Sequence, residues 1–124
     1  QITYIDGIKF INVGISFPDK IITNEIKISQ ASEVMDLVDD NTILLGDFHN
    51  KDCDFPDELN LDKRNLMNHV HSNTYQQYKD QWLWVDSLDK IITTKKCPFI
   101  IEDVKVLTYE SKDRIHFPVS FYVR

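Results

Sequence analysis

The sequence predicts a layered α/β domain of mixed strands and helices, and three observations support this prediction. Two β-rich runs flank the turn dipeptide Asp6-Gly7, apolar residues recur at helical spacing between residues 31 and 38, and a continuous apolar run ends at Gly46-Asp47. Further runs rich in β-branched and aromatic residues fill the second half of the chain. The predicted order is hairpin, helix, strand, helix and then several strands.

The first predicted elements are a hairpin and a helix. Ile2–Ile5 and Ile8–Ile15 should pair through Asp6-Gly7, which favours a two-residue turn. Ser29 or Ser32 should cap the helix, which should end before Asp39-Asp40-Asn41. The apolar positions that predict this helix are Ala31, Val34, Met35, Leu37 and Val38.

The later elements follow from the same kind of pattern. Thr42–Leu45 is apolar without alternation, which predicts a strand that is buried on both faces and ends at Gly46-Asp47. Residues 48–62 are loop-like, and a second helix is expected from Asp62 to about Ser72. Its inward-facing side chains would be Leu66, Met67 and Val70. Strands are expected within 83–93, 100–109 and 118–123.

The composition is that of one packed globular unit. Hydrophobic residues make up 42% of the 124 residues, and no repeat or Gly-, Pro- or Ser-rich linker divides the chain, so we expect residues 1–124 to form a single domain. A domain of this size folds alone only if both faces of its sheet are covered. Because the chain begins at Gln1, we expect a processed product or a piece of a longer protein.

Charge and cysteine content limit the function classes. The net charge is −6 with no cluster of Lys and Arg, which excludes a broad basic surface for a phosphate backbone. A phosphodiesterase is still compatible, because a cation held by carboxylates can supply positive charge. Cys53 and Cys97 lack metal-site spacing, so we expect free thiols and an intracellular, reducing compartment. No apolar stretch approaches the roughly 20 residues that span a bilayer, so no membrane role is expected.

Three segments carry short motifs in a suggestive order. They are Ile-Leu-Leu-Gly-Asp-Phe-His-Asn at 43–50, Val-Asp-Ser-Leu-Asp-Lys-Ile-Ile at 85–92, and Arg-Ile-His-Phe-Pro-Val at 114–119. Together they resemble the carboxy-terminal half of the endonuclease/exonuclease/phosphatase superfamily, the DNase I-like fold. That family has a strand ending in Gly-Asp-Phe-Asn, a late strand Arg-Ile-Asp-Tyr-Ile and a terminal Ser-Asp-His-x-Pro-Val. The resemblance implies half of a four-layer sandwich, with a mixed, mostly antiparallel sheet and two helices.

The resemblance also implies a catalytic site. By position, Asp47 would orient or activate the attacking water, and His49 would replace the family's Asn. His116 would be the catalytic histidine, and Asp89 would orient its imidazole. The implied function is that of a metal-dependent phosphodiester hydrolase acting on nucleic acid or a related phosphoester. Its cofactor would be Mg²⁺ or Mn²⁺ if the chain is active, and none otherwise.

Departures from the family pattern leave a second hypothesis open. Ile115 stands where the family has a metal-associated Asp, and Asp113 lies two positions too early to replace it. The family's first half, with its metal-binding Glu, has no counterpart here. The alternative to an impaired hydrolase is therefore a catalytically inactive structural or protein-interaction module in a larger assembly. In both cases we expect an amino-terminal half-domain, a second chain or a homodimer partner to cover the sheet.

Three other groups are interpreted as structural. His69 and His71 are expected on the surface of the second helix, where residues two apart face differently. An acidic stretch lacks the spacing of a calcium loop and is expected to be solvated; it consists of Asp52, Asp54, Asp57 and Glu58. Four aromatic residues could stack on bases or bind a partner, although the commonest role of such residues is core and rim packing, so no role is assigned to them; they are Tyr75, Tyr78, Trp82 and Trp84.

Overall fold

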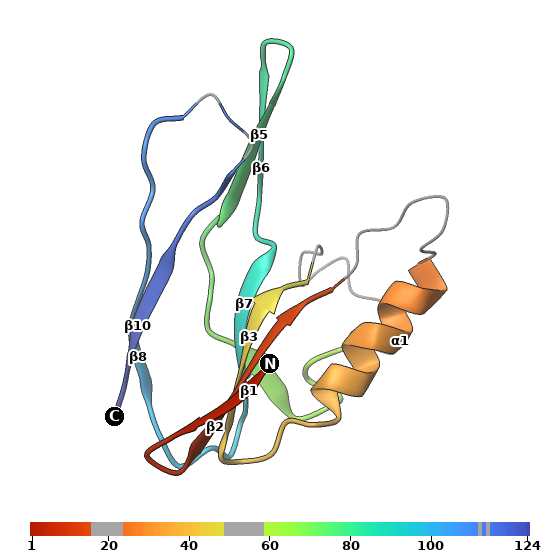
Figure 1. Cartoon of the computed structure of the whole chain (residues 1–124), viewed down its shortest axis with the longest axis vertical. Coiled ribbons are helices and arrows are strands. Elements are labelled where there is room, and N and C mark those ends of the chain that lie inside the picture. The colour runs from red at the N-terminus through yellow and green to blue at the C-terminus, as the bar shows by residue number, and fades with distance from the viewer. Residues whose placement is uncertain (16–23, 49–58, 112, 114) are drawn as a thin grey trace.

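The computed structural model describes residues 1–15, 24–48, 59–111, 113 and 115–124. These residues form one helix and ten strands (Figure 1). In chain order, they are β1 (Ile2–Ile5), β2 (Ile8–Gly14), α1 (Asn24–Met35), β3 (Thr42–Asp47), β4 (Leu66–Asn68), β5 (Tyr75–Lys79), β6 (Trp82–Asp86), β7 (Asp89–Thr94), β8 (Ile101–Val106), β9 (Ile115–His116) and β10 (Val119–Val123). The mixed α and β content agrees with the predicted class.

A five-stranded sheet with the order β1-β2-β3-β7-β4 forms the centre of the molecule. Strands β2 and β3 run parallel, and the other neighbouring pairs are antiparallel. Parallel neighbours cannot be joined by a tight turn, and α1 lies in the connection between β2 and β3. The sheet is thus mixed and mostly antiparallel, as the resemblance implied.

The amino-terminal hairpin forms as predicted. Ile5 pairs with Ile8, so only Asp6 and Gly7 make the turn. Both turn residues have positive φ, 50° at Asp6 and 80° at Gly7, as a two-residue turn that follows the strand twist requires.

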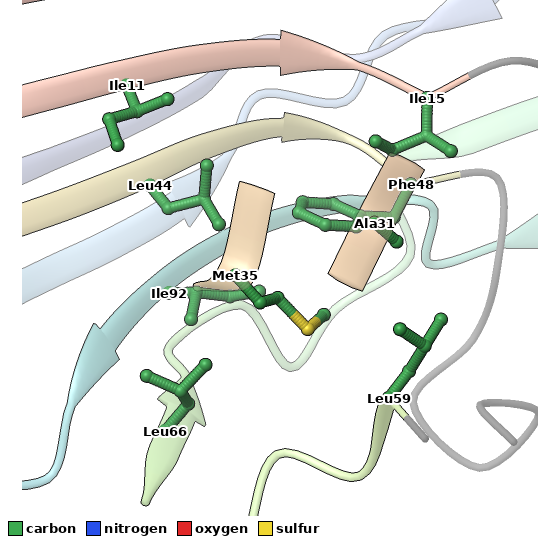
Figure 2. Close-up of a cluster of buried hydrophobic side chains, with 9 residues drawn as sticks. All are labelled: Ile11, Ile15, Ala31, Met35, Leu44, Phe48, Leu59, Leu66 and Ile92. Atoms are coloured by element: carbon green, nitrogen blue, oxygen red, sulfur yellow. The ribbon is translucent and has the colours of Figure 1, made fainter. Parts of the chain in front are cut away.

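Helix α1 covers one face of the central sheet, and the pair β8 and β10 covers the other. On the helix side, Leu44 and Ile92 meet Ala31 and Met35 in a buried cluster (Figure 2). On the opposite side, Ile43 belongs to a second buried cluster that contains residues of β8 and β10. Adjacent residues of β3 therefore point into different cores, which explains its apolar run without alternation and confirms the predicted burial on both faces.

A third, smaller sheet has the order β6-β5-β9. Its β5–β6 hairpin extends beyond the central sheet, upward in Figure 1. Within this sheet, the short strand β9 pairs with β5 and places His116 opposite Tyr75. The late strands expected within 83–93, 100–109 and 118–123 correspond to β6 and β7, β8 and β10.

Two helix predictions were wrong in part. Helix α1 begins at Asn24, before both expected caps, and ends at Met35, so Leu37 lies outside it and is 51% exposed. The expected helix from Asp62 to Ser72 is instead a turn followed by β4. Asn65 has φ 58°, which ends the turn, and β4 then pairs with β7, so tertiary pairing overrides a spacing that also suits a helix.

Two further expectations are settled only for the described residues. Cys97 is a free thiol, as predicted, whereas Cys53 and the acidic stretch from 52 to 58 lie outside the described residues. In the part of the chain that the structure describes, no helix has the length and apolar character needed to cross a membrane.

Candidate functional site

Three strand ends bring two carboxylates and an imidazole together. Asp47 is the last residue of β3, Asp89 is the first residue of β7, and the two are directly paired across the antiparallel ladder. Directly opposed residues of such a pair project to the same face of the sheet. His116 ends β9 and approaches from the small sheet. Residues far apart in sequence therefore meet through strand register.

The side-chain distances define a compact cluster. Nδ1 of His116 lies 2.8 Å from Oδ2 of Asp89, and Nε2 lies 3.5 Å from Oδ2 of Asp47. The side chain of His116 is 37% exposed, and those of Asp47 and Asp89 are 22% and 23% exposed. The cluster is thus ordered by its neighbours but open to a ligand from solvent.

The hydrogen bond to Asp89 fixes the role of each ring nitrogen. An ionised carboxylate only accepts hydrogen bonds, so Nδ1 of His116 carries the proton and donates it to Asp89. In the neutral imidazole, Nε2 is then the nitrogen that carries no proton, and it lies near Asp47. Asp89 orients the ring, and the Nε2 side is where proton transfer would take place.

Thr74 connects the strands that carry this pair. Its hydroxyl accepts hydrogen bonds from the backbone N–H groups of Leu88 (3.2 Å) and Asp89 (3.0 Å). Its carbonyl accepts from the N–H of Phe117 at 2.6 Å, next to His116. Thr74 is fully buried, so these bonds hold the start of β7 and the end of β9 together without competition from water.

The aromatic ring of Tyr75 supports the imidazole from a second direction. The ring centroids of Tyr75 and His116 lie 4.9 Å apart, at an angle of 57°. The Tyr75 hydroxyl donates to Oε1 of Gln77 at 3.0 Å, which fixes the ring on that face of β5. Asp89 and Tyr75 together define the orientation of His116.

A lysine that sequence reasoning missed acts on the same cluster. Lys27 lies on α1 with only 6% of its surface exposed. Burial lowers the pKa of its ammonium, and the charge of Asp47 works in the opposite direction. A signal was available, because positions 27, 31 and 35 follow at four-residue intervals, which puts Lys27 on the helix face of the buried Ala31 and Met35.

The cluster also has the donor atoms of a metal site. The cluster offers three potential ligand atoms that all lie within 4.8 Å of one another, one each from Asp47, Asp89 and His116. Among the described residues, no other group of three or more His, Cys, Asp or Glu side chains is arranged in this way. Two carboxylates with one imidazole suit Mn²⁺, whereas Mg²⁺ prefers oxygen ligands and retained water. The donor set therefore fits a divalent ion of the expected kind, with Mn²⁺ the better match.

Of the four residues expected at the site, three converge. These are Asp47, Asp89 and His116, whereas His49 lies outside the described residues. Ile115 precedes His116 on β9 and pairs with Gln76, so its side chain projects to the opposite face of the strand. Asp113 is exposed and does not belong to the cluster of Asp47, Asp89 and His116.

The other singled-out groups also have definite positions. His69 and His71 follow β4 in an irregular segment, so their expected position on a helix was wrong. His69 is half-buried, and its Nε2 lies 2.9 Å from Oγ1 of Thr93. Trp82 and Trp84 are 68% and 58% exposed on β6, so neither indole is packed in the core.

Comparison with known proteins adds no relative. No protein-family model matches the sequence, and no match is found among the curated proteins. The functional argument therefore depends on the geometry of the site.

Proposed function

We propose that this chain is a DNase I-like domain that hydrolyses phosphodiesters at Asp47, Asp89 and His116. The observation that supports the proposal is the convergence of these side chains from three separate strand ends. Hydrolysis of a phosphodiester requires a base for the attacking water and a donor for the charge that develops on the phosphoryl oxygens. A carboxylate beside an oriented imidazole can supply both.

In the proposed reaction, Asp47 accepts a proton from a water whose oxygen attacks phosphorus. Protonated His116, held by Asp89, donates from Nε2 to a non-bridging phosphoryl oxygen. The ester P–O bond breaks, and the leaving alkoxide takes a proton from solvent to give an alcohol beside a phosphomonoester. The 3.5 Å between Asp47 and Nε2 of His116 suits groups that hold neighbouring oxygens of one phosphorus centre.

Positive charge would come from two sources. A divalent ion held by the carboxylates of Asp47 and Asp89 would supply a Lewis acid for the phosphoryl group, and the imidazole could join as a ligand only in its unprotonated form. Lys27 adds a buried ammonium whose charge acts on Asp47, so the chain itself offsets part of the negative charge at the cluster. Because the metal ligands found are only three, we expect slow turnover from this chain alone.

A specific observation keeps an inactive module as the second candidate. Ile115 occupies the position of the family's metal-associated Asp, and its neighbour in the ladder, Gln76, bonds the carbonyl of Ser111. The residues at this position of β9 and β5 therefore make structural contacts and supply no metal ligand. A chain that retained only the fold would keep the Asp89–His116 hydrogen bond as packing and would show no response to metal.

The test is hydrolysis of bis(4-nitrophenyl) phosphate and of an oligonucleotide with Mn²⁺ or Mg²⁺. We expect Asp47→Asn and His116→Ala each to lower kcat/KM by ~10²-fold or more, because each change removes a proton-handling or charge-stabilising group. Thermal unfolding should change little, since both side chains are partly exposed.

The matched control is Asp113→Asn, which removes a carboxylate outside the cluster and should leave the rate unaltered. Equal rates in the parent, Asp47→Asn and His116→Ala would refute the site. Absence of both hydrolysis and a metal-induced thermal shift in the parent would favour the inactive module.

A further inference from the structure

The β5–β6 hairpin exposes an unusual amount of aromatic surface. Trp82 and Trp84 are 68% and 58% exposed, and the hairpin that carries them extends beyond the central sheet (Figure 1). A single exposed apolar residue is ordinary, but two tryptophans at alternate positions of one strand form a contiguous surface that is typical of a binding site.

Strand register places this surface on the same face as the catalytic cluster. Tyr75 pairs with His116, and their rings lie 4.9 Å apart. The Tyr75 hydroxyl reaches Gln77, and Gln77 pairs with Trp84. Directly paired residues, and residues two apart on a strand, share a face. Trp82 is two residues from Trp84, so His116, Tyr75, Trp84 and Trp82 form one row, which we name the aromatic row.

The length of the aromatic row suits a short stretch of nucleotides. From Tyr75 to the residue paired with Trp82 is four residues along β5, or about 13 Å. Stacked nucleotides of one strand rise by about 3.4 Å each, and unstacked ones extend further. Tyr75 is buried, so the part of the row that can stack on bases is Trp84 and Trp82, which is enough for two nucleotides next to a phosphodiester at His116.

The net charge limits how a nucleic acid could be bound. The chain has a net charge of −6, so neutralisation of a phosphate backbone cannot provide most of the affinity. Indole rings bind the flat faces of bases, and those faces are accessible in a single strand but stacked and paired within a duplex. An acidic protein with exposed tryptophans beside its candidate site is suited to unpaired nucleotides.

We propose that the aromatic row binds unpaired nucleotides of a single-stranded nucleic acid and directs the adjoining phosphodiester to Asp47, Asp89 and His116. This inference depends on the proposed function for the cleavage step but not for binding. The opposite face of the hairpin carries Leu83, 49% exposed, which pairs with Tyr78 and points away from the row. The two faces can therefore be tested separately.

The experiment measures binding of a fluorescein-labelled ten-nucleotide single strand to the Asp47→Asn chain, in which we expect cleavage to be suppressed. Trp82→Ala and Trp84→Ala should each weaken binding by about 10-fold, because each removes one stacking partner. Leu83→Ala, which changes an exposed neighbour on the opposite face, should bind as the parent does. A duplex of the same length should bind at least about 10-fold more weakly than the single strand.

Cleavage separates this inference from the proposed function. With an intact site, Trp82→Ala should lower oligonucleotide cleavage more than hydrolysis of bis(4-nitrophenyl) phosphate. Tryptophan-dependent binding without hydrolysis of any diester would support the aromatic row and reject the proposed function. Unchanged binding in both tryptophan variants would overturn the proposed role of the aromatic row. The role would also be overturned if the chain does not bind the oligonucleotide and instead forms dimers that Trp82→Ala abolishes.

Discussion

His69 is held as a hydrogen-bond donor in a half-buried position. The Thr93 hydroxyl donates to the carbonyl of Thr94 at 3.0 Å, so its oxygen is left to accept from Nε2–H of His69 at 2.9 Å. Burial lowers the pKa of His69 from 6.5, and the neighbouring charge of His71 lowers it further. The folded state therefore favours the neutral ring.

This shift predicts a loss of stability on mild acidification. Because the folded pKa of His69 is depressed, its contribution is complete above about pH 6.5 and is lost as pH falls below that value. We expect the urea midpoint to decrease between pH 7.5 and 5.5, and His69→Gln to flatten this dependence. His71→Gln, which removes only the smaller cause, should retain most of it. Equal pH slopes in the parent and His69→Gln would contradict the prediction.

The candidate residues differ in how far sequence could identify them. Asp47, Asp89 and His116 were predicted because the three short motifs that contain them resemble motifs of one family, and the structure brings these side chains together. Thr74 was not predicted, because it holds the strands of the site through three hydrogen bonds to backbone N–H groups that no local sequence pattern encodes. Lys27 was missed because the predicted helix began after it.

At the scale of elements, the pairing of β2 with β3 depends on Gly46. Gly46 lies opposite Val13 in the parallel ladder and has φ 150°. A Cβ at this position would lie 2.0 Å from the backbone oxygen of Val13. Both the backbone conformation and the close approach therefore require glycine immediately before Asp47.

Gly46→Ala should destabilise the fold by about 3 kcal/mol or more, because the strands must separate or strain to admit the methyl group. Urea unfolding measures the change. Gly14→Ala is the matched control, since a Cβ at Gly14 meets nothing within 4 Å, and it should stay within about 1 kcal/mol of the parent. If Gly46→Ala lowers the free energy of unfolding as little as Gly14→Ala does, the clash with Val13 is relieved without cost and the prediction is wrong.

Elements with a strong local signal were predicted, and those fixed by distant partners were not. The Asp6-Gly7 hairpin and β3 carry their own turn and burial patterns. Strand β4 has only three residues, and its strand conformation comes from pairing with β7 and from Asn68, whose side chain bonds Val70 and Ile91. Spacing alone could not distinguish this segment from a helix.

At the scale of the whole molecule, both faces of the central sheet are covered, but no strand of the described residues pairs with the outer edge of β1. Strand β1 ends the strand order, and it contains no charge and no proline. Ile2, Tyr4 and Ile5 are 52%, 69% and 54% exposed. Natural proteins protect such edges with charges, prolines or a covering segment, so an apolar edge of this kind favours pairing with another strand.

We therefore expect this chain to self-associate through β1 when it is studied alone. Sedimentation velocity at increasing concentration should detect dimers or larger species, and Tyr4→Lys should shift the distribution to monomer because it places a charge at the edge. Ser29→Lys adds the same charge on the exposed side of α1 and should leave association unchanged. If the parent chain stays monomeric, or if both lysine variants dissociate it equally, the β1 edge is not the contact, and the exposed apolar residues of β6 become the next surface to test.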